Sequence, residues 1–364
     1  MPKISLSGPA ELLTVLPYHL GFRPERSVVV VCVHEARLGL VARLDLVGPA
    51  DAARAAAQTV PALVQQRPSH VVLVGFAGAP DGPGDPDEPG DPMPLLEALR
   101  QGLDEHGVTV AERLVVRDER WFGLDCDCCP APGRRVPEPA DVPAVAEYVA
   151  MGTAVLGSRD ELARLVEPLP PDDPHHDARL TAVEEWVGRL DRADGGATVA
   201  DRRTRGELVD EALGAWVRLV RDGLDVDPSP RIVAALVGPL VDTHVRDLLV
   251  SWLCPGFPAD HVSGELATRL RRALGAHGLP ETDAVADART ERLVLSRVEQ
   301  LCRATPEAVA APLLAATAAY AWWLGDGAHA SFAVDRALHV DPGHGLATLV
   351  RAALEHGVRP PRCA

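Results

Sequence analysis

The chain has 364 residues, a formal net charge of −16 and a hydrophobic content of 47%. This length and apolar content allow two domains, each with a core of ordinary size. The acidic balance argues against a nucleic-acid partner, because phosphate binding depends on clustered Lys and Arg side chains. No apolar run approaches the roughly 20 residues that span a bilayer, and the amino terminus lacks the pattern of a secretory signal. We therefore expect a soluble, cytoplasmic protein with no membrane partner.

Residues 1–140 predict an α/β domain. Two continuously apolar runs, residues 27–34 and 70–76, are typical of strands buried on both faces of a sheet. Residues 38–47 alternate better and predict a strand that pairs with the first run as a hairpin. Because helical patterns separate the strands, we predict a mixed sheet covered by helices. A further hairpin of residues 109–116 and 120–124 is expected to turn at Asp118-Glu119. A helix is expected to begin at Ser7, and Pro17 should limit it to about two turns. Two more helices are expected at 51–66 and 95–106.

The segment 78–94 is dominated by Gly, Pro and Asp. A segment of this composition cannot bury enough apolar surface to order itself. We therefore predict an acidic loop between the second apolar strand and the helix that follows it.

Residues 141–364 predict a helical array, and we find no convincing strand pattern after Leu180. Gly, Pro or Asp marks almost every junction between helices. Residues 330–342 have the small-residue spacing and the terminal Pro of the second helix of a tetratricopeptide repeat, and residues 322–325 echo the first. The spacing between these two parts does not fit one regular repeat. The alternative interpretation is a simple helical hairpin packed by small residues. The helices are expected near 181–191, 204–222, 231–237, 241–253, 262–277, 289–303, 306–324, 328–339 and 346–356.

Three of the seven cysteines, Cys126, Cys128 and Cys129, lie within four positions. Thiolates bind zinc tetrahedrally, so these three would supply all but one ligand of a closed site. The fourth ligand is not identified, although His175 or His176 could donate it. Reversible thiol chemistry and a compact turn with small reduced cysteines are the alternatives, and the sequence leaves all three open.

Arg120 and Trp121 precede the cysteine turn, which we define as residues 124–133. Together they could offer a stacking and anion-binding surface for a ligand. The alternative is that Trp121 is a partly buried anchor against the neighbouring layer. We therefore take Arg120 and Trp121 as candidate ligand-binding residues, and we keep the anchor role of Trp121 as the alternative.

Several short motifs resemble those of one family and together cover most of the chain. They are residues 10–17, 20–24, 27–30, Arg120-Trp121 with Cys128–Pro130, Ser158-Arg159, Val245–Asp247 and the Trp-Leu-Gly-Asp-Gly run at 323–327 with the Asp-Pro that follows it. The sequence thus resembles an actinobacterial family known as domain of unknown function 4192. The resemblance implies no activity. This sequence departs from the pattern by a first cysteine closer to the Cys-Cys pair, which argues against a metal site, and by the acidic insertion at 78–94.

We expect a cytoplasmic binding or regulatory module with a protein or small-molecule partner, which uses the helical half and the cysteine turn. No acid, base and nucleophile converge in the sequence to define a catalyst. The first alternative is a metal-assisted hydrolase with a pocket near the cysteine turn, His175 and His176. The second is a structural subunit that associates with itself through a sheet edge or a Trp-containing helix.

Overall fold

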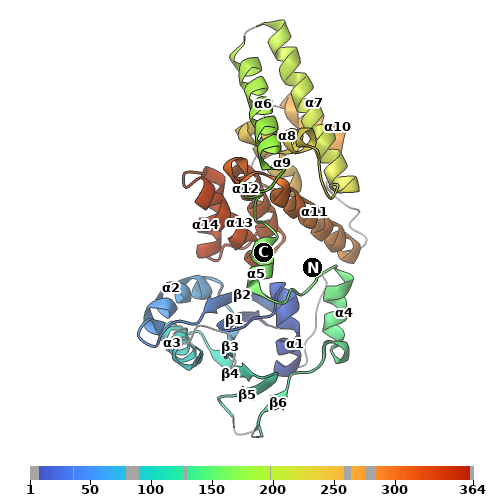
Figure 1. Ribbon diagram of the computed structural model, residues 1–364. Coiled ribbons are helices and arrows are strands. Elements are labelled where there is room, and N and C mark those ends of the chain that lie inside the picture. Colours follow the sequence, from blue (N-terminus) through green and yellow to red (C-terminus); the bar gives the residue numbers. More distant parts are fainter. Residues whose placement is uncertain are drawn as a thin grey trace. The chain divides into compact units, whose positions relative to one another are not determined.

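The computed structural model describes residues 8–35, 37–78, 90–126, 129–130, 132–196, 198–257, 264–274 and 284–360 (Figure 1). The chain forms two compact units, Met1–Arg159 with Glu355–Arg359, and Asp160–Leu354 with Pro360–Ala364. Residues 79–89 of the predicted acidic loop lie outside the described residues. An α/β arrangement followed by helices agrees with the fold class that the sequence predicts.

Within its described residues, the first unit is built on a six-stranded mixed sheet with the order β2-β1-β3-β4-β5-β6. Neighbouring strands are antiparallel except β3 and β4, which are parallel and joined through the helix α3 (Met93–Glu105). The hairpins predicted for β1 with β2 and for β4 with β5 are both present. The strands are β1 (Ser27–His34), β2 (Arg37–Asp45), β3 (His70–Phe76), β4 (Val110–Arg117), β5 (Arg120–Gly123) and β6 (Arg134–Arg135).

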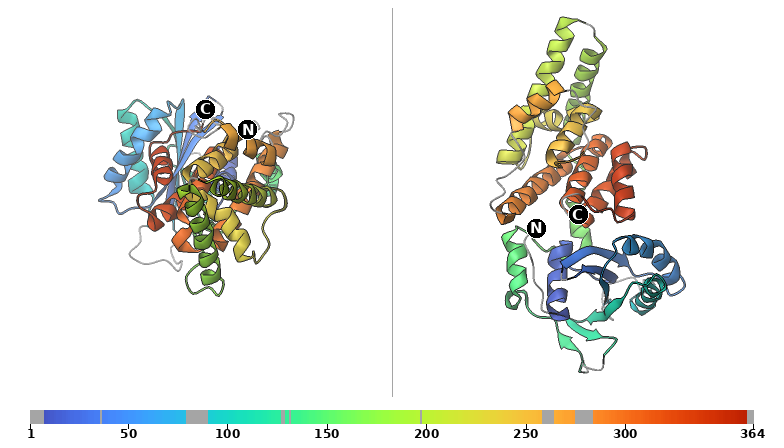
Figure 2. Two further views of the ribbon diagram at one scale, coloured as in Figure 1. Left: turned by 90° about the horizontal axis from the view of Figure 1, so that it is seen from above. Right: turned by 180° about the vertical axis from the view of Figure 1, so that it is seen from behind.

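Both faces of the central strands are covered, as their continuous apolar sequence predicts. Val28 and Val30 face the helices α2 (Ala52–Gln65) and α3 (Met93–Glu105) in one core. Val29 and Val31 alternate with them and are also fully buried, since successive side chains of a strand point to opposite faces. Figures 1 and 2 show α1 (Pro9–Leu20) on the side of the sheet opposite α2 and α3.

The prediction that Pro17 limits the first helix to about two turns is wrong. Helix α1 runs through Pro17 and ends at Leu20, where Gly21 adopts the left-handed conformation. A proline inside a helix removes one backbone hydrogen bond and crowds the preceding turn. The last turn nevertheless forms, because Leu16 and Leu20 on it are buried.

The first compact unit extends to Arg159, past the boundary at residue 140 that the change of sequence pattern suggests. Helix α4 (Pro143–Ala150) packs on α1, and the hydroxyl of Tyr148 lies 3.1 Å from Nδ1 of His19. The following segment also joins the unit, because Leu156 donates a backbone hydrogen bond to Gly21. Tertiary contacts, which composition does not reveal, therefore assign this helix to the first unit.

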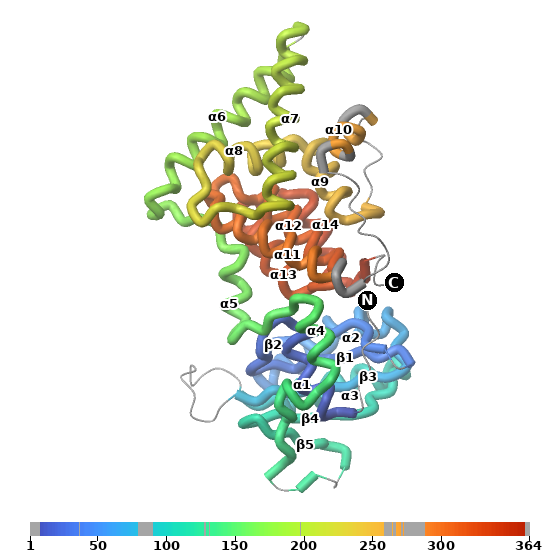
Figure 3. Tube along the Cα trace, turned by 90° about the vertical axis from the view of Figure 1, so that its right-hand side faces the viewer, coloured from blue at the N-terminus to red at the C-terminus, as the bar shows by residue number. Residues whose placement is uncertain are grey.

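The second unit is helical in the part that the structure describes, apart from an isolated bridge between Leu169 and Pro306. Each helix expected after Leu180 has a counterpart. Helix α12 is buried almost all round, as its apolar sequence requires, and it packs against α11 and α13 (Figure 3). The helices are α5 (Arg159–Arg164), α6 (His176–Gly195), α7 (Val199–Asp222), α8 (Pro230–Val237), α9 (Thr243–Leu253), α10 (Gly264–Leu274), α11 (Ala284–Ala304), α12 (Ala311–Trp323), α13 (Gly327–Val340) and α14 (Gly345–Glu355).

No helix in the described ranges is long and apolar enough to cross a membrane. The longest helix, α7, instead carries an apolar stripe of buried residues such as Leu208, Leu213 and Trp216 on one side. Its other side bears charged residues. This amphipathic pattern is that of a helix packed on a protein core.

Candidate functional site

The cysteine turn follows β5 directly. Asp118 and Glu119 both have positive φ, 49° and 59°, which is the geometry of a two-residue turn whose twist matches its strands. Strand β5 then ends at Gly123, whose backbone N–H donates a 3.3 Å hydrogen bond to Sγ of Cys129. A Cβ on Gly123 would lie 3.1 Å from Sγ of Cys126. The glycine therefore lets two sulfurs approach the end of the strand.

The structure leaves the predicted metal site at Cys126, Cys128 and Cys129 as a prediction. Cys126 is disulfide-bonded and Cys129 is a free thiol, whereas Cys128 lies outside the described residues. Among the residues that are described, no group of three or more His, Cys, Asp or Glu side chains is arranged to hold a metal ion.

Arg120 and Trp121 do not form one surface. Adjacent residues of a strand point to opposite faces, and the Trp121 ring is buried beneath the guanidinium of Arg134, whose Cζ lies 5.7 Å from the ring centroid. Arg120 instead donates a 2.9 Å hydrogen bond to the carbonyl of Gly133. These contacts give Trp121 a packed environment and leave Arg120 on the other side of the sheet.

His175 and His176 take part in contacts around the start of α6. Nδ1 of His176, a buried residue, lies 3.0 Å from Oδ1 of Asp177, and Nδ1 of His175 lies 3.7 Å from Oδ1 of Asp227. Asp227 also accepts a 2.5 Å hydrogen bond from the buried Arg179. Both histidines belong to the second compact unit and the cysteine turn belongs to the first.

Two adjacent surface hollows on the second unit combine concave shape with charge. Their volumes are about 290 Å³ and 650 Å³. Asp210, Gly214 and Arg218 line both, because residues four positions apart share one face of α7. The first is also lined by Glu211, Arg231, Ile232 and Ala235, and the second by Leu213, Val217, Arg269 and Arg272. We call these residues the arginine hollow.

Gly214 provides the depression in this face of α7. Glycine inside a helix costs about 1 kcal/mol relative to alanine. A Cβ at Gly214 would meet only Nη1 of Arg218, at 3.7 Å, so the space above the glycine is open. The missing side chain between Asp210 and Arg218 therefore leaves room for a ligand at the surface.

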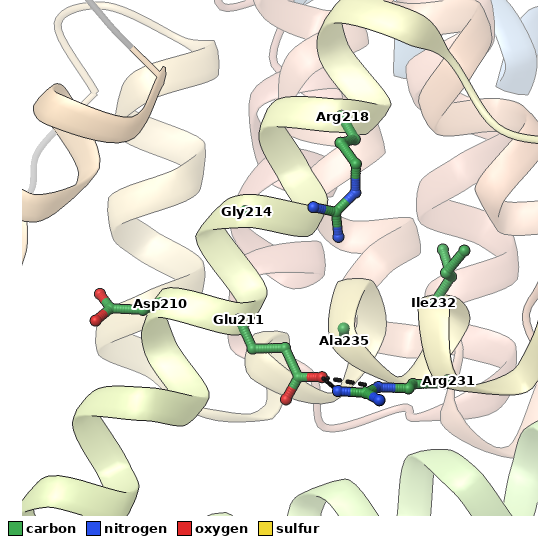
Figure 4. A pocket seen from close by; sticks show the side chains of 7 residues that line it. All are labelled: Asp210, Glu211, Gly214, Arg218, Arg231, Ile232 and Ala235. Carbon is green, nitrogen blue, oxygen red and sulfur yellow. Dashed lines mark hydrogen bonds and ion pairs between the residues drawn. The ribbon is translucent and has the colours of Figure 1, made fainter.

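The arginine hollow holds more positive than negative charge. Glu211 accepts hydrogen bonds from Nε and Nη2 of Arg231 at 3.1 and 2.9 Å (Figure 4). Asp210 lies 3.7 Å from Nη1 of Arg269. Neither Arg218 nor Arg272 has an ion-pair or hydrogen-bond partner within the described part of the chain. Two guanidinium groups are thus available to an anion.

A buried charged cluster elsewhere in the second unit escaped the sequence analysis. Asp326 caps α13 by accepting a hydrogen bond from the backbone N–H of His329, and its Oδ2 lies 2.9 Å from Nδ1 of that histidine. On the other side of the ring, Nε2 lies 3.3 Å from Oε1 of Glu299 on α11, and neither of these two ring contacts has the alignment of a hydrogen bond. Arg292 approaches Asp326 at 3.7 Å. We call these four residues the buried cluster.

Burial and mutual charge shift the pKa values in the buried cluster. Burial raises the pKa of Glu299 to about 7, and the nearby His329 only partly opposes this. Burial would lower the pKa of His329, but Asp326 and Glu299 outweigh it and raise that pKa. The pKa of Asp326 stays low although burial would raise it, because His329 and Arg292 favour the carboxylate. The sequence does offer one signal for this cluster, an Asp at a helix N-cap position three residues before a histidine. It offers no signal that His329 lies beside Glu299.

The protein is of the α/β plus all-α class, because a mixed sheet with helices on both faces is followed by a helical unit. The family model described as "Domain of unknown function (DUF4192)" matches residues 9–361. Because the match covers nearly the whole chain, the protein belongs to the DUF4192 family. No match was found among the curated proteins or among the solved structures.

Proposed function

We propose that this protein is a binding module whose helical unit takes an anionic small molecule in the arginine hollow. The observation that carries the proposal is the pair of guanidinium groups, Arg218 and Arg272, which line the hollows without a carboxylate partner in the described residues. We propose a cytoplasmic setting for this binding, as the irregular spacing of the seven cysteines predicts.

The chemistry of arginine favours phosphate or carboxylate groups as the anion. The guanidinium presents a planar fork of donors that matches two oxygens of either group. The protein as a whole carries a formal charge of −16, so a local excess of positive charge is not explained by the bulk composition. The volumes of about 290 and 650 Å³ fall within or near the range of small-molecule sites.

Titration calorimetry with inorganic pyrophosphate on the full chain tests the proposal. The Arg218→Gln/Arg272→Gln double variant should weaken binding by at least about tenfold, since each charge-assisted hydrogen bond contributes about 1.5 kcal/mol or more. Gly214→Leu should weaken it as well by filling the depression. Arg189→Gln/Arg203→Gln is the matched control, because it also removes two charges from exposed positions of the second unit and neither residue lines the hollow. Undetectable pyrophosphate binding by the unmodified protein, or equal losses in the control, would contradict the proposal.

Zinc binding by the cysteine turn is a second candidate. It is favoured by the N–H hydrogen bond from Gly123 to Cys129. The Cys126 sulfur lies close to the same glycine and would be a second ligand once its disulfide is reduced. Metal content should be measured by plasma mass spectrometry on tag-free protein prepared under reducing conditions. Near-stoichiometric zinc that is lost in the Cys126, Cys128 and Cys129 to Ser triple variant would support this site and would reopen the alternative of a metal-assisted hydrolase. Metal-free protein whose folding is unchanged in the variant would remove both.

A further inference from the structure

Three arginines lie side by side across three neighbouring strands of the first unit. Backbone pairing places Arg117 of β4 opposite Arg120 of β5, and Arg120 opposite Arg135 of β6. Directly paired residues of antiparallel strands carry their side chains on the same face. The next pairing in the ladder, Trp121 with Arg134, obeys this rule, since the two side chains are stacked. Arg117, Arg120 and Arg135 therefore form a row, which we call the arginine row.

No carboxylate neutralises the arginine row within the described residues. Arg113 lies four residues before Arg117 on the same face of β4 and is neutralised. Asp125 lies 2.5 Å and Glu97 2.8 Å from its guanidinium group. Neither Arg117 nor Arg135 has any such partner in the described part of the chain, and Arg120 bonds only to the carbonyl of Gly133. Like charges placed opposite one another destabilise a sheet, so the row is better explained by a ligand than by folding.

The geometry of the row selects the shape of that ligand. Neighbouring strands are separated by about 4.8 Å, so three strands spread the guanidinium groups over about 10 Å. Arg117 and Arg135 are exposed, and neither residue lines the arginine hollow. A flat line of forked cations fits an extended anion that presents oxygens at every step of its length.

We propose that the arginine row binds a linear phosphate chain that lies across β4, β5 and β6. A phosphate chain supplies several anionic oxygens within the length of the row, whereas a single phosphate reaches only one or two of the guanidinium groups. This site is in the first unit and goes beyond the function proposed for the arginine hollow, on which it does not depend. The same chemistry would be met by free polyphosphate or by the phosphate chain of a nucleotide.

Calorimetry with inorganic tripolyphosphate tests the proposal, in full-length protein that carries Arg218→Gln/Arg272→Gln so that the arginine hollow does not contribute. Adding Arg117→Gln/Arg135→Gln should weaken binding by about tenfold or more and make it less sensitive to salt. Arg37→Gln/Arg54→Gln removes the same charge from exposed positions of the first unit and is the matched control. It should change the affinity less than about twofold. Circular dichroism of each variant establishes that it is folded.

Three outcomes would overturn the proposal. The first is a loss of affinity in the control as large as in the Arg117→Gln/Arg135→Gln variant, which would mean that only net charge matters. The second is unchanged binding in that variant. The third is binding of a polyglutamate peptide or a single-stranded oligonucleotide as tightly as tripolyphosphate, which would assign the row to a different partner. Tighter binding of adenosine triphosphate than of tripolyphosphate would support the row and identify a nucleotide as the source of the phosphate chain.

Discussion

The arginine hollow and the buried cluster use the same types of side chain in the same unit, yet burial gives them opposite properties. Arg218 and Arg272 are exposed and lack partners among the described residues. The side chains of Glu299, Asp326 and His329 are 8%, 10% and 13% exposed. The His329 ring lies 3.3 Å from Glu299 and 2.9 Å from Asp326. Charges removed from water are costly unless they are paired. The cluster is therefore expected to govern stability, and the hollow to govern binding.

The largest effect should come from removing Asp326. Asp326→Ala deletes the cap of α13, removes the carboxylate that Arg292 approaches and leaves His329 with Glu299 alone. Breaking a buried ion pair by removing one partner typically costs 3–5 kcal/mol, so we expect the free energy of unfolding to fall by about 3 kcal/mol or more. Urea unfolding followed by tryptophan fluorescence measures it. Asp341→Ala is the control, because the side chain of this exposed aspartate accepts, among the described residues, only the backbone N–H of Gly343. Similar losses in both variants would contradict the importance of burial.

Next in size is a dependence of stability on pH. The pKa of Glu299 is raised from its usual value of 4.5 to about 7, so the folded protein retains a proton that the unfolded chain releases between these values. The free energy of unfolding should therefore fall as pH rises through this window, by up to roughly 3 kcal/mol. His329 acts in the same direction, because its pKa is also raised in the folded state. Asp326 acts oppositely, and its contribution is lost only below its usual pKa of 3.8.

Glu299→Gln should remove most of this pH dependence, since glutamine does not titrate. Urea unfolding at pH 5 and at pH 8 compares the slopes. Glu207→Gln, at an exposed position on α7, should retain the slope of the unmodified protein. An unchanged slope in Glu299→Gln would mean that Glu299 titrates as it does in water, and the contrast between the buried cluster and the arginine hollow would then weaken.

Local sequence signals predicted most of the fold. The apolar runs of β1 and β3 and the turn at Asp118-Glu119 depend on neighbouring residues only, so periodicity and turn chemistry were sufficient. The end of α1 and the limit of the first unit depend on contacts made far along the chain, such as that between His19 and Tyr148. Such contacts leave no periodic pattern in the sequence.

The candidate sites were harder to predict for the same reason. Glu299 and His329 come from different helices, and either residue alone reads as a charged surface position. The arginine hollow likewise requires α7 to meet α10, which brings Arg269 toward Asp210. Arg120 was identified from the sequence, but its neighbours in the arginine row depend on the register of β6 with β5. Sequence reasoning therefore identifies candidate residues more readily than their arrangement.

Substitution of two glycines by alanine should change the free energy of unfolding by smaller amounts and in opposite directions. Gly214→Ala should raise the free energy of unfolding by up to about 1 kcal/mol, because alanine is the better helix former and the new Cβ meets only the end of Arg218. Gly238→Ala should lower it by about 1–3 kcal/mol, because its Cβ would lie 2.5 Å from the ring of the buried Trp186. Thermal unfolding of both variants measures the difference. A destabilised Gly214→Ala protein would show that the depression on α7 is already filled.

The smallest change in stability should accompany Arg218→Gln. Arg218 is exposed and has no partner in the described part of the chain, so we expect the free energy of unfolding to change by less than about 0.5 kcal/mol. The affinity for pyrophosphate should fall in the same preparation, because the guanidinium fork is lost while the fold is retained. Urea unfolding and calorimetry on one sample separate the two quantities. A stability loss above about 1 kcal/mol would assign Arg218 a supporting role like that of Asp326, and the arginine hollow would then be a feature of folding instead of a place for a ligand.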